Sequence, residues 1–216
     1  MEIPVIGLGA GGHARVLLEA LSFDQTYKLI GFLDRDPDLM HKDILGVPVI
    51  GNDDLLPGLS KEISHFFIGL GSVGSVSHRL RLFSQAISLG MSPINIIHPR
   101  AIVSASAVLG NGSAVLAGAI INACVKMGDN VIINTGSIVE HDSLIGDHVH
   151  IATGARLCGA VQVDRETHIG AGATILQGVR IGANSIVGAG AVVIKDVPDG
   201  VVVVGTPAKI IKSTKG

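Results

Sequence analysis

A histidine and an aspartate stand side by side near the middle of the sequence, as His141 and Asp142. A carboxylate next to an imidazole makes the imidazole more basic, and such a ring can remove a proton from an attacking nucleophile near neutral pH. The pair therefore predicts a general base. A histidine exposed at a corner of the chain, with an unrelated acid beside it, would give the same two residues, so both interpretations stay open at this point.

A glycine-rich loop near the N-terminus is the second candidate for chemistry. Residues 7–13 read GLGAGGH, after an apolar run over 3–8 and before a helical pattern over 14–21. The backbone amides of such a loop, together with the positive end of the helix, suit a phosphate or a diphosphate. Asp34 follows the next predicted strand, 27–33, about where dinucleotide folds place a ribose-binding acid. A tight turn that only glycine tolerates remains the alternative.

The elements around this loop predict a small α/β module. Further strands are expected over 47–51, 66–70 and 93–97. A helix from about 75 to 88 would carry Leu80, Phe83 and Ile87 on one face. This module is half of a doubly wound dinucleotide fold, so it would hold one nucleotide more comfortably than two.

From Ala101 to Asp196 the sequence repeats every six residues without a break. Each of the sixteen units has an aliphatic residue at the same position, from Val103 to Val193, and Ala, Ser, Thr or Val two positions earlier. A period of six fits neither a helical stripe nor an alternating strand. It suits a short strand of about four residues with a two-residue corner, so that three units close one triangular coil.

Residues eighteen apart would then stack in successive coils, about 4.8 Å from each other. One corner column holds a glycine in each coil, which suits a backbone with positive φ. A small residue precedes each of these glycines, so we expect a smooth groove along that edge. The glycines are Gly118, Gly136, Gly154, Gly172 and Gly190, and the small residues are Ala117, Thr135, Thr153, Ala171 and Ala189.

The same arithmetic defines the surroundings of the two histidines of interest. Ala123 lies eighteen residues before His141 and Gly159 eighteen after it, so small neighbours leave the ring accessible to a substrate. His150 lies half a coil further on, on the opposite side of the triangle and next to the small-residue groove. One prism cannot easily bring His141 and His150 together, which favours a site between subunits of a cyclic oligomer. A purely structural His150, hydrogen-bonded on a strand face, stays open.

Composition bounds the classes of function. The 216 residues carry a formal net charge of −2, which gives no electrostatic footprint for nucleic acid or an anionic membrane. No apolar run reaches the roughly 18 residues of a membrane span, and no signal peptide is recognisable. Cys124 and Cys158 do not stack, so we expect two buried free thiols in a reducing, cytoplasmic setting. The repeat sets the expected boundaries, an α/β domain over 1–98 and a coil with a C-terminal tail over 99–216.

The repeat and the closing segment GTPAK over 205–209 resemble the hexapeptide-repeat acyltransferases. The whole chain also resembles a narrower family, the acetyltransferases of sialic acid and of nucleotide-linked amino sugars. The matching segments are GAGGH over 9–13, IGLG over 68–71, NIIHP over 95–99, EHD over 140–142 and His150. The fold that this resemblance implies is a half-Rossmann-like α/β module followed by a left-handed parallel β-helix.

The resemblance also implies a role for each matching residue. His141 would be the base, Asp142 would increase its basicity, and His150 would contact acetyl-coenzyme A. Further coenzyme contacts fall on Gly159, Ala171 and Ala189. Sugar-nucleotide contacts fall on Gly11, Gly12, His13, Asp34, Arg35 and Gly71. Some relatives have a glutamate in place of Asp142 and an acid in place of Arg35, so the nucleotide base stays open.

The function implied is direct transfer of an acetyl group from acetyl-coenzyme A to the C4 amine of a nucleotide-linked amino sugar, with GDP-perosamine favoured. UDP- or dTDP-linked 4-amino sugars, or a hydroxyl of sialic acid, are the alternative acceptors. The resemblance further implies a cytoplasmic homotrimer, active sites between subunits, a role in O-antigen biosynthesis, and no metal.

Two rival classes share parts of this pattern. The γ-type carbonic anhydrases have the same prism and bind zinc through three histidines between subunits. Their His-x4-His pair is missing here, because no two of His141, His148, His150 and His168 are five residues apart. A nucleotide-sensing scaffold, in which the prism only trimerises, would bind nucleotide and have no affinity for coenzyme A.

Overall fold

The computed structural model describes residues 2–72 and 76–214. The chain divides into two compact units. The α/β unit contains residues 1–71 and 77–97, and the coil unit contains residues 72–76 and 98–216. Ser72, which follows the last glycine of the predicted nucleotide site, thus belongs to the coil unit. No helix of the described residues is long and apolar enough to cross a membrane.

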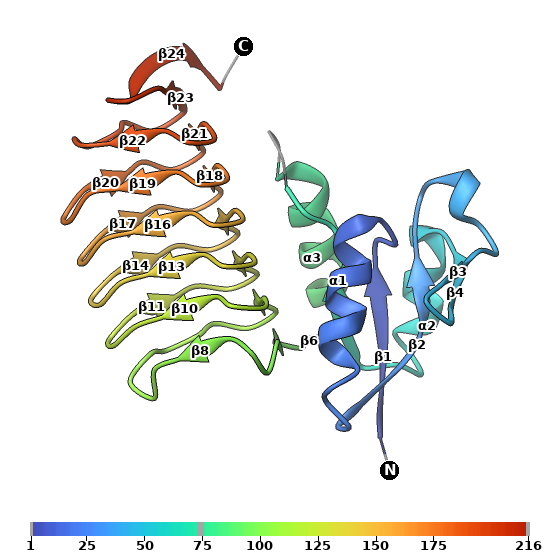
Figure 1. Cartoon of the computed structure of the whole chain (residues 1–216). Helices are drawn as coiled ribbons and strands as arrows, with labels where there is room; N and C mark the ends of the chain where they lie inside the picture. The colour runs from blue at the N-terminus through green and yellow to red at the C-terminus, as the bar shows by residue number, and fades with distance from the viewer. Residues whose placement is uncertain (1, 73–75, 215–216) are drawn as a thin grey trace. The chain divides into compact units, whose positions relative to one another are not determined.

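A mostly parallel sheet forms the centre of the α/β unit (Figure 1), with strand order β3-β4-β2-β1-β5-β6. Its strands are β1 (Ile3–Leu8), β2 (Tyr27–Leu33), β3 (Asp43–Ile44), β4 (Val47–Gly51), β5 (His65–Ile68) and β6 (Ser92–Pro93), and β7 (Ile96–Ile97) follows. From β1 the chain crosses over to β2 on one side, and from β5 it crosses to β6 on the other. The order therefore reverses between β1 and β5, and open α/β sheets bind ligands at the carboxyl ends of the strands around such a point.

The helices of this unit are amphipathic. Helix α1 (Gly12–Leu21) buries Ala14, Leu17, Ala20 and Leu21, which recur every three or four residues. Helix α3 (Ser77–Ser88) buries Leu82, Phe83 and Ala86 in the same way, together with a charged residue, Arg79. Three short elements complete the unit, namely α2 (Leu56–Leu59) and the 3-10 helices η1 (Pro37–Leu39) and η2 (Asp53–Leu55).

The predicted strands and helices of this unit are found with some corrections. The strand predicted over 93–97 is wrong in extent, because the Ile94 N–H makes the last bond to β5, at Phe66 O (2.9 Å), before the chain turns. Strand β3 and helix α2 were not predicted, since each is too short to show a period. The predicted helix start at residue 75 lies outside the described residues.

The coil unit is a stack of strands on three faces (Figure 1), which pair in parallel except for β23 and β24, which pair antiparallel with each other. One face has the order β22-β19-β16-β13-β10-β8, a second β11-β14-β17-β20, and the third runs from β24 and β23 through β21, β18, β15 and β12 to β9. Within the repeat, each strand residue pairs with the residue eighteen positions away, for example Ile120 with Ile138 and Ile138 with Arg156. The predicted coil of three units is therefore confirmed.

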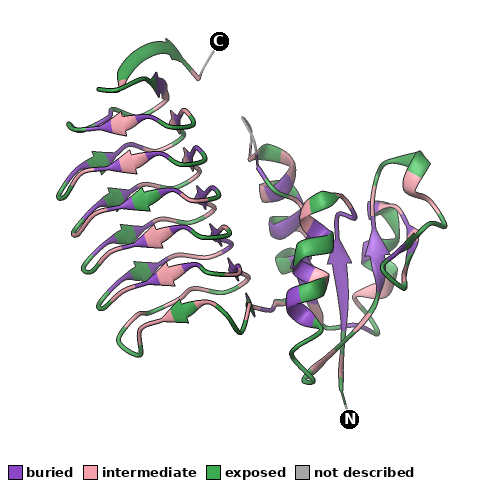
Figure 2. Cartoon of the chain, in the orientation of Figure 1, coloured by how far each residue is buried: buried purple, intermediate pink, exposed green. Residues whose placement is uncertain are grey.

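Within the repeat the strands of the coil unit have two residues each, not the four predicted, because a turn lies on each side of every pair, and the two strands after the repeat are longer. They are β8 (Ile102–Val103), β9 (Ala114–Val115), β10 (Ile120–Ile121), β11 (Lys126–Met127), β12 (Ile132–Ile133), β13 (Ile138–Val139), β14 (Leu144–Ile145), β15 (His150–Ile151), β16 (Arg156–Leu157), β17 (Gln162–Val163), β18 (His168–Ile169), β19 (Thr174–Ile175), β20 (Arg180–Ile181), β21 (Ile186–Val187), β22 (Val192–Val193), β23 (Val201–Val204) and β24 (Lys209–Ser213). From Val115 to Val193, the repeated aliphatic residues lie in one buried cluster (Figure 2).

Positive φ is found at all three corners, not only at the predicted glycine column. The glycines at 118, 136, 154, 172 and 190 have φ between 66° and 68°. The other corners reach the same region with side chains in place, as at Asn130 (φ 55°), Asp142 (φ 59°) and Ala160 (φ 57°). Asn and Asp tolerate this conformation better than other residues do, which gives the acid at 142 a backbone reason as well as a chemical one.

Both cysteines are free, as expected, but Cys124 is exposed and Cys158 is only partly buried. The prediction of two buried thiols is therefore wrong. Cys124 occupies a left-handed corner (φ 61°), where the side chain turns away from the core.

Candidate active site

His141 and Asp142 form a bonded pair at the corner that follows β13. The distance from His141 Nδ1 to Asp142 Oδ2 is 2.8 Å, and both side chains are more than half exposed. A carboxylate can only accept, so Nδ1 carries the hydrogen and donates it to Asp142. The other ring nitrogen, Nε2, is then left with a lone pair that can accept a proton.

Gly159 makes room for the His141 ring. A Cβ atom at position 159 would lie 2.7 Å from His141 Nε2 and Cε1, closer than any side chain could be tolerated. The ring therefore stacks on the glycine of the next coil, as the eighteen-residue arithmetic predicted. The Ala160 N–H also donates to His141 O (2.8 Å), which fixes the corner below the imidazole.

His150 lies on a different face, in β15, and is 4% exposed. Its Nδ1 lies 2.8 Å from Ser72 O, and its Nε2 lies 3.2 Å from Asn134 Nδ2. Asn134 Oδ1 accepts from the Thr135 N–H (2.8 Å), which orients the amide so that its NH2 group faces the imidazole. His150 Nε2 is then an acceptor and Nδ1 a donor to Ser72. A contact from His150 to a coenzyme would require one of these partners to move.

His168 lies against His150, with the ring centroids 4.9 Å apart and the planes nearly perpendicular. Burial lowers the pKa of His168, and a hydrogen bond with the Ser72 backbone opposes that shift. Its Nδ1 is buried without a hydrogen-bond partner among the described residues. Within that part of the chain, no group of three or more His, Cys, Asp or Glu side chains is placed to hold a metal ion.

The small residues predicted to contact the coenzyme lie on the outside of the coil. Ala171 and Ala189 are exposed, each directly before a glycine with positive φ, and Thr153 is exposed in the coil before them. A column without large side chains could accept a long, thin ligand along the edge, as the predicted groove requires.

The glycine loop of the α/β unit contains glycines of two kinds. Gly7 and Gly9 are required by packing, because a Cβ there would lie 2.4 Å from Phe32 and 2.5 Å from Leu70 respectively. Around Gly11 and Gly12 a Cβ would meet no atom of the described residues within 4 Å. Gly11 is the N-cap of α1 and offers no side-chain cap to the helix. Within the described part of the chain, the start of α1 therefore combines uncapped amides with open space beside its glycines, as an anion site requires.

Two basic groups lie beside this loop, Arg79, which is buried, and His13, which is partly buried. Arg79 is 3% exposed, and its Nε and Nη1 have no hydrogen-bond partner among the described residues. Burial lowers the Arg79 pKa to about 9. Burial, with a smaller contribution from the positive charge of Arg79, lowers the pKa of His13 to about 4, and His13 Nε2 is also unpaired within the same residues. A buried guanidinium with unpaired donors is costly, and His13, neutral near pH 7, adds an unpaired ring nitrogen, so this region suits an anion.

Asp34 and Arg35 follow β2 and lie at the carboxyl edge of the sheet. Asp34 Oδ2 accepts from the Ala10 N–H (2.7 Å), and its Oδ1 accepts from the Asp36 N–H (2.9 Å). The carboxylate thus holds the glycine loop in addition to any ribose contact.

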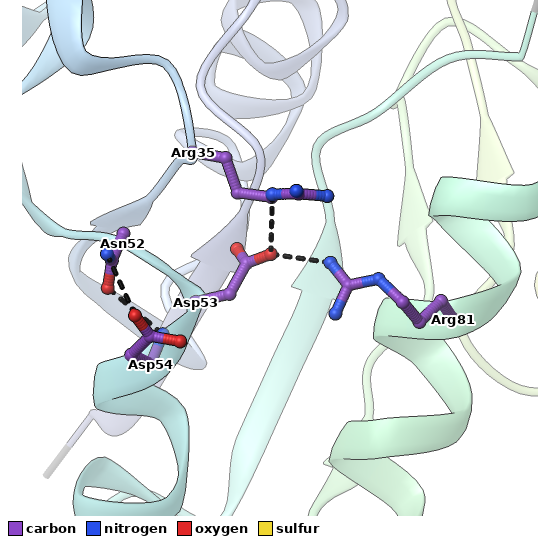
Figure 3. A pocket seen from close by; sticks show the side chains of 5 residues that line it. All are labelled: Arg35, Asn52, Asp53, Asp54 and Arg81. Carbon is purple, nitrogen blue, oxygen red and sulfur yellow. Dashed lines mark hydrogen bonds and ion pairs between the residues drawn. The ribbon is translucent and has the colours of Figure 1, made fainter.

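Arg35 lines an open cavity of about 460 Å³ with Asn52, Asp53, Asp54 and Arg81 (Figure 3). Gly71 is exposed, and a Cβ there would lie 3.9 Å from that of His13.

Comparison with known proteins identifies the family. Residues 5–86 match the PglD N-terminal domain, and residues 160–195 match the bacterial transferase hexapeptide. The structure of PerB from Caulobacter crescentus, in complex with CoA and GDP-perosamine, is 42% identical over 97% of both chains, with a TM-score of 0.88. The chain belongs to the hexapeptide-repeat sugar acetyltransferases.

Other solved structures agree with this assignment. The acetyltransferase domain of PglB from Neisseria gonorrhoeae, in complex with acetyl coenzyme A, is 38% identical over 98% of this chain and 100% of its own, with a TM-score of 0.89. WeeI from Acinetobacter baumannii is 27% identical, covers 98% of this chain and 100% of its own, and has a TM-score of 0.81. No curated protein matches the sequence. The predicted fold class, a half-Rossmann-like module followed by a left-handed parallel β-helix, is confirmed.

Sequence reasoning missed the charged residues of the α/β unit. Arg79 and Arg81 lie on a helix whose pattern suggested only an apolar face, and Asp53 lies in a 3-10 helix that was not predicted. Ser72 was also missed as a partner of His150. The only signal available for Arg79 was its spacing of three from Leu82, which places it on the buried face of α3.

Proposed function

We propose that this protein transfers an acetyl group from acetyl-coenzyme A to the C4 amine of a nucleotide-linked amino sugar. The observation that carries the proposal is the His141–Asp142 pair, with its free Nε2 exposed above Gly159. A base of this kind is what an amine needs to lose its proton while it attacks a thioester. The PerB complex, with CoA and GDP-perosamine bound, makes GDP-perosamine the first acceptor to test.

The residues of the coil unit divide the chemistry between them. As the amine nitrogen bonds to the carbonyl carbon of the thioester, His141 Nε2 takes the proton that the nitrogen loses. The Asp142 carboxylate holds the Nδ1 hydrogen and stabilises the imidazolium that forms. The bond from carbon to sulfur breaks, and coenzyme A leaves as the thiol or thiolate. No covalent bond to the enzyme is needed, so Cys124 and Cys158 have no part in the reaction.

The α/β unit would hold the nucleotide. Gly11 and Gly12 leave the amides of α1 open, and His13 and Arg79 supply the buried donors for a diphosphate. Asp34, Arg35 and Gly71 complete the expected contacts at the carboxyl edge of the sheet. On the coil, Gly159, Ala171 and Ala189 remain the expected coenzyme contacts, and His150 would join them once Asn134 or Ser72 releases it.

We extend the proposal to a cytoplasmic homotrimer with active sites between subunits, taking part in O-antigen biosynthesis. The exposed His141 and its separation from His150 on another face both favour a second chain completing the site. Sedimentation analysis would test the trimer directly, with a stable monomer at micromolar concentration as the contradicting result.

The test of the activity is release of free coenzyme A with a panel of acceptors, with product mass measured in parallel. The acceptors are GDP-perosamine, a UDP-4-amino sugar, a dTDP-amino sugar and free sialic acid. We expect one nucleotide amino sugar to be strongly preferred and to gain one acetyl group. Activity on sialic acid alone would replace N-acetylation with O-acetylation. Silence with every acceptor, together with tight nucleotide binding, would favour a sensing scaffold.

A further inference from the structure

The cavity at the carboxyl edge of the α/β unit has a charge pattern that a phosphate does not explain. Its lining combines two acids, Asp53 and Asp54, with two arginines, Arg35 and Arg81, and an amide, Asn52. These five residues, called the base pocket below, come from the ends of β2 and β4 and from α3 (Figure 3). The volume of about 460 Å³ falls in the range of small-molecule sites.

Asp53 is the centre of the base pocket. Its side chain is 9% exposed, and its Oδ2 lies 2.6 Å from Arg81 Nη2 and 4.0 Å from Arg35 Nε. His78 Nε2 lies 3.7 Å from the same oxygen. Over the described part of the chain, Oδ1 of Asp53 accepts no hydrogen bond. A carboxylate has acceptor sites on both oxygens, so one side of Asp53 is held by arginine and the other is available to a ligand.

The two arginines differ in how they are held. Arg81 is fixed by Asp53 and by Gln85 Oε1 (3.2 Å), so its donors are already oriented. Arg35 has a side chain that is 62% exposed, and among the described residues it is held only by the long contact to Asp53. A loosely held guanidinium at the mouth of a cavity can lie flat on an aromatic ring.

Guanine matches a carboxylate beside arginines most fully, since cytosine offers the carboxylate only its 4-amino group. Guanine presents two neighbouring donors, N1–H and the 2-amino group, next to acceptors at O6 and N7. Arginine is the usual partner of O6 and N7. Uracil offers one N–H between two carbonyls, and adenine has no pair of adjacent donors, so both would leave Asp53 poorly satisfied.

We propose that the base pocket recognises guanine, with Asp53 Oδ1 accepting from N1–H and the 2-amino group, Arg81 donating to the O6 and N7 edge, and Arg35 lying flat on the ring. The proposal rests on the proposed function in taking the ligand as a nucleotide sugar, and it assigns the specificity for its base to Asp53, Arg81 and Arg35. The diphosphate would then lie at the glycine loop. Asp34, which follows β2 between the glycine loop and the base pocket, would face the ribose, as the corresponding acid does in dinucleotide folds.

The test is isothermal titration of the full chain with GDP, IDP and UDP, without acetyl-coenzyme A. IDP lacks only the 2-amino group, so the difference between GDP and IDP measures the contact between that amino group and Asp53. We expect GDP to bind at least tenfold more tightly than IDP, and UDP to bind more weakly than either. Asp53→Asn should bring the ratio of GDP to IDP affinity close to one. The matched control is Asp38→Asn, an exposed acid of η1 outside the pocket, which should keep the wild-type ratio.

A second variant guards against a failure of Asp53→Asn to fold. Arg35 is exposed, so Arg35→Ala should keep the fold, and we expect it to weaken GDP binding at least fivefold. Tighter binding of UDP than of GDP, or an unchanged ratio of GDP to IDP in folded Asp53→Asn, would overturn the inference. These outcomes are separate from the activity, because an enzyme that acetylates a UDP sugar would refute the base assignment and leave the acetyl transfer intact.

Discussion

The two units of this chain differ in how easily their candidate functional residues can be recognised in the sequence. In the coil unit the core is aliphatic and every position has equivalents eighteen residues away, so a histidine between Ala123 and Gly159 is conspicuous. The α/β unit holds all five phenylalanines and the single tyrosine, Tyr27, and no position in it repeats. A charged residue in the α/β unit therefore cannot be recognised as an exception to a repeated pattern. The repeat therefore reveals the candidate site of the coil unit from the sequence alone. The candidate site of the α/β unit becomes visible only from side-chain contacts in the structure.

The largest expected effect on stability comes from His13 in the α/β unit. His13 has a pKa of about 4 in the folded chain against 6.5 in the unfolded one, so the unfolded state binds more protons below pH 6.5. Stability should fall as the pH drops from 6.5 to 4, by about 3 kcal/mol in all, and level off below. Denaturant titrations followed by Tyr27 fluorescence report on this unit. His13→Asn should remove that part of the slope, and the exposed-loop control His41→Asn should keep it.

The next effect tests the stacked corner of the coil unit. Gly159→Ala puts a methyl group where the His141 ring lies, so the base must move. We expect kcat to fall about a hundredfold, since displacing a catalytic group by an ångström can cost this much. Gln177→Ala, one coil further along the same column, should leave kcat within twofold. Normal turnover in Gly159→Ala would mean that the ring position seen here is not the working one.

The smallest effects test the backbone of the corners. Gly154 has φ 66°, so Gly154→Ala should destabilise the coil by about 1 kcal/mol. Ala160 already bears a side chain at φ 57°, so Ala160→Gly should be stabilising by up to about 1 kcal/mol or neutral. Thermal unfolding followed by far-ultraviolet circular dichroism measures both. Equal destabilisation by the two changes would show that left-handed strain does not govern these corners.

The extent of prediction from the sequence follows the same division. A period of six predicts the coil and its aliphatic core. Because residues eighteen apart stack in successive coils, it also predicts the strand pairing and the stacking of His141 on Gly159. The bonds of His150 to Ser72 and Asn134 could not be predicted, because Ser72 belongs to no repeat. In the α/β unit the glycine loop and the main strands were predictable from local patterns. Asp53 and Arg81, 28 residues apart, meet only through the packing of α3, which no local pattern encodes.

The central claim is that the coil unit supplies the base and the α/β unit supplies nucleotide recognition. The most direct test is the turnover of His141→Asn at saturating acetyl-coenzyme A and nucleotide amino sugar, with GDP affinity measured on the same sample. The account predicts a loss of about a thousandfold or more in kcat, the range expected for a missing general base, with GDP affinity unchanged. Near-normal turnover, or a loss of GDP affinity comparable to the loss of kcat, would contradict it.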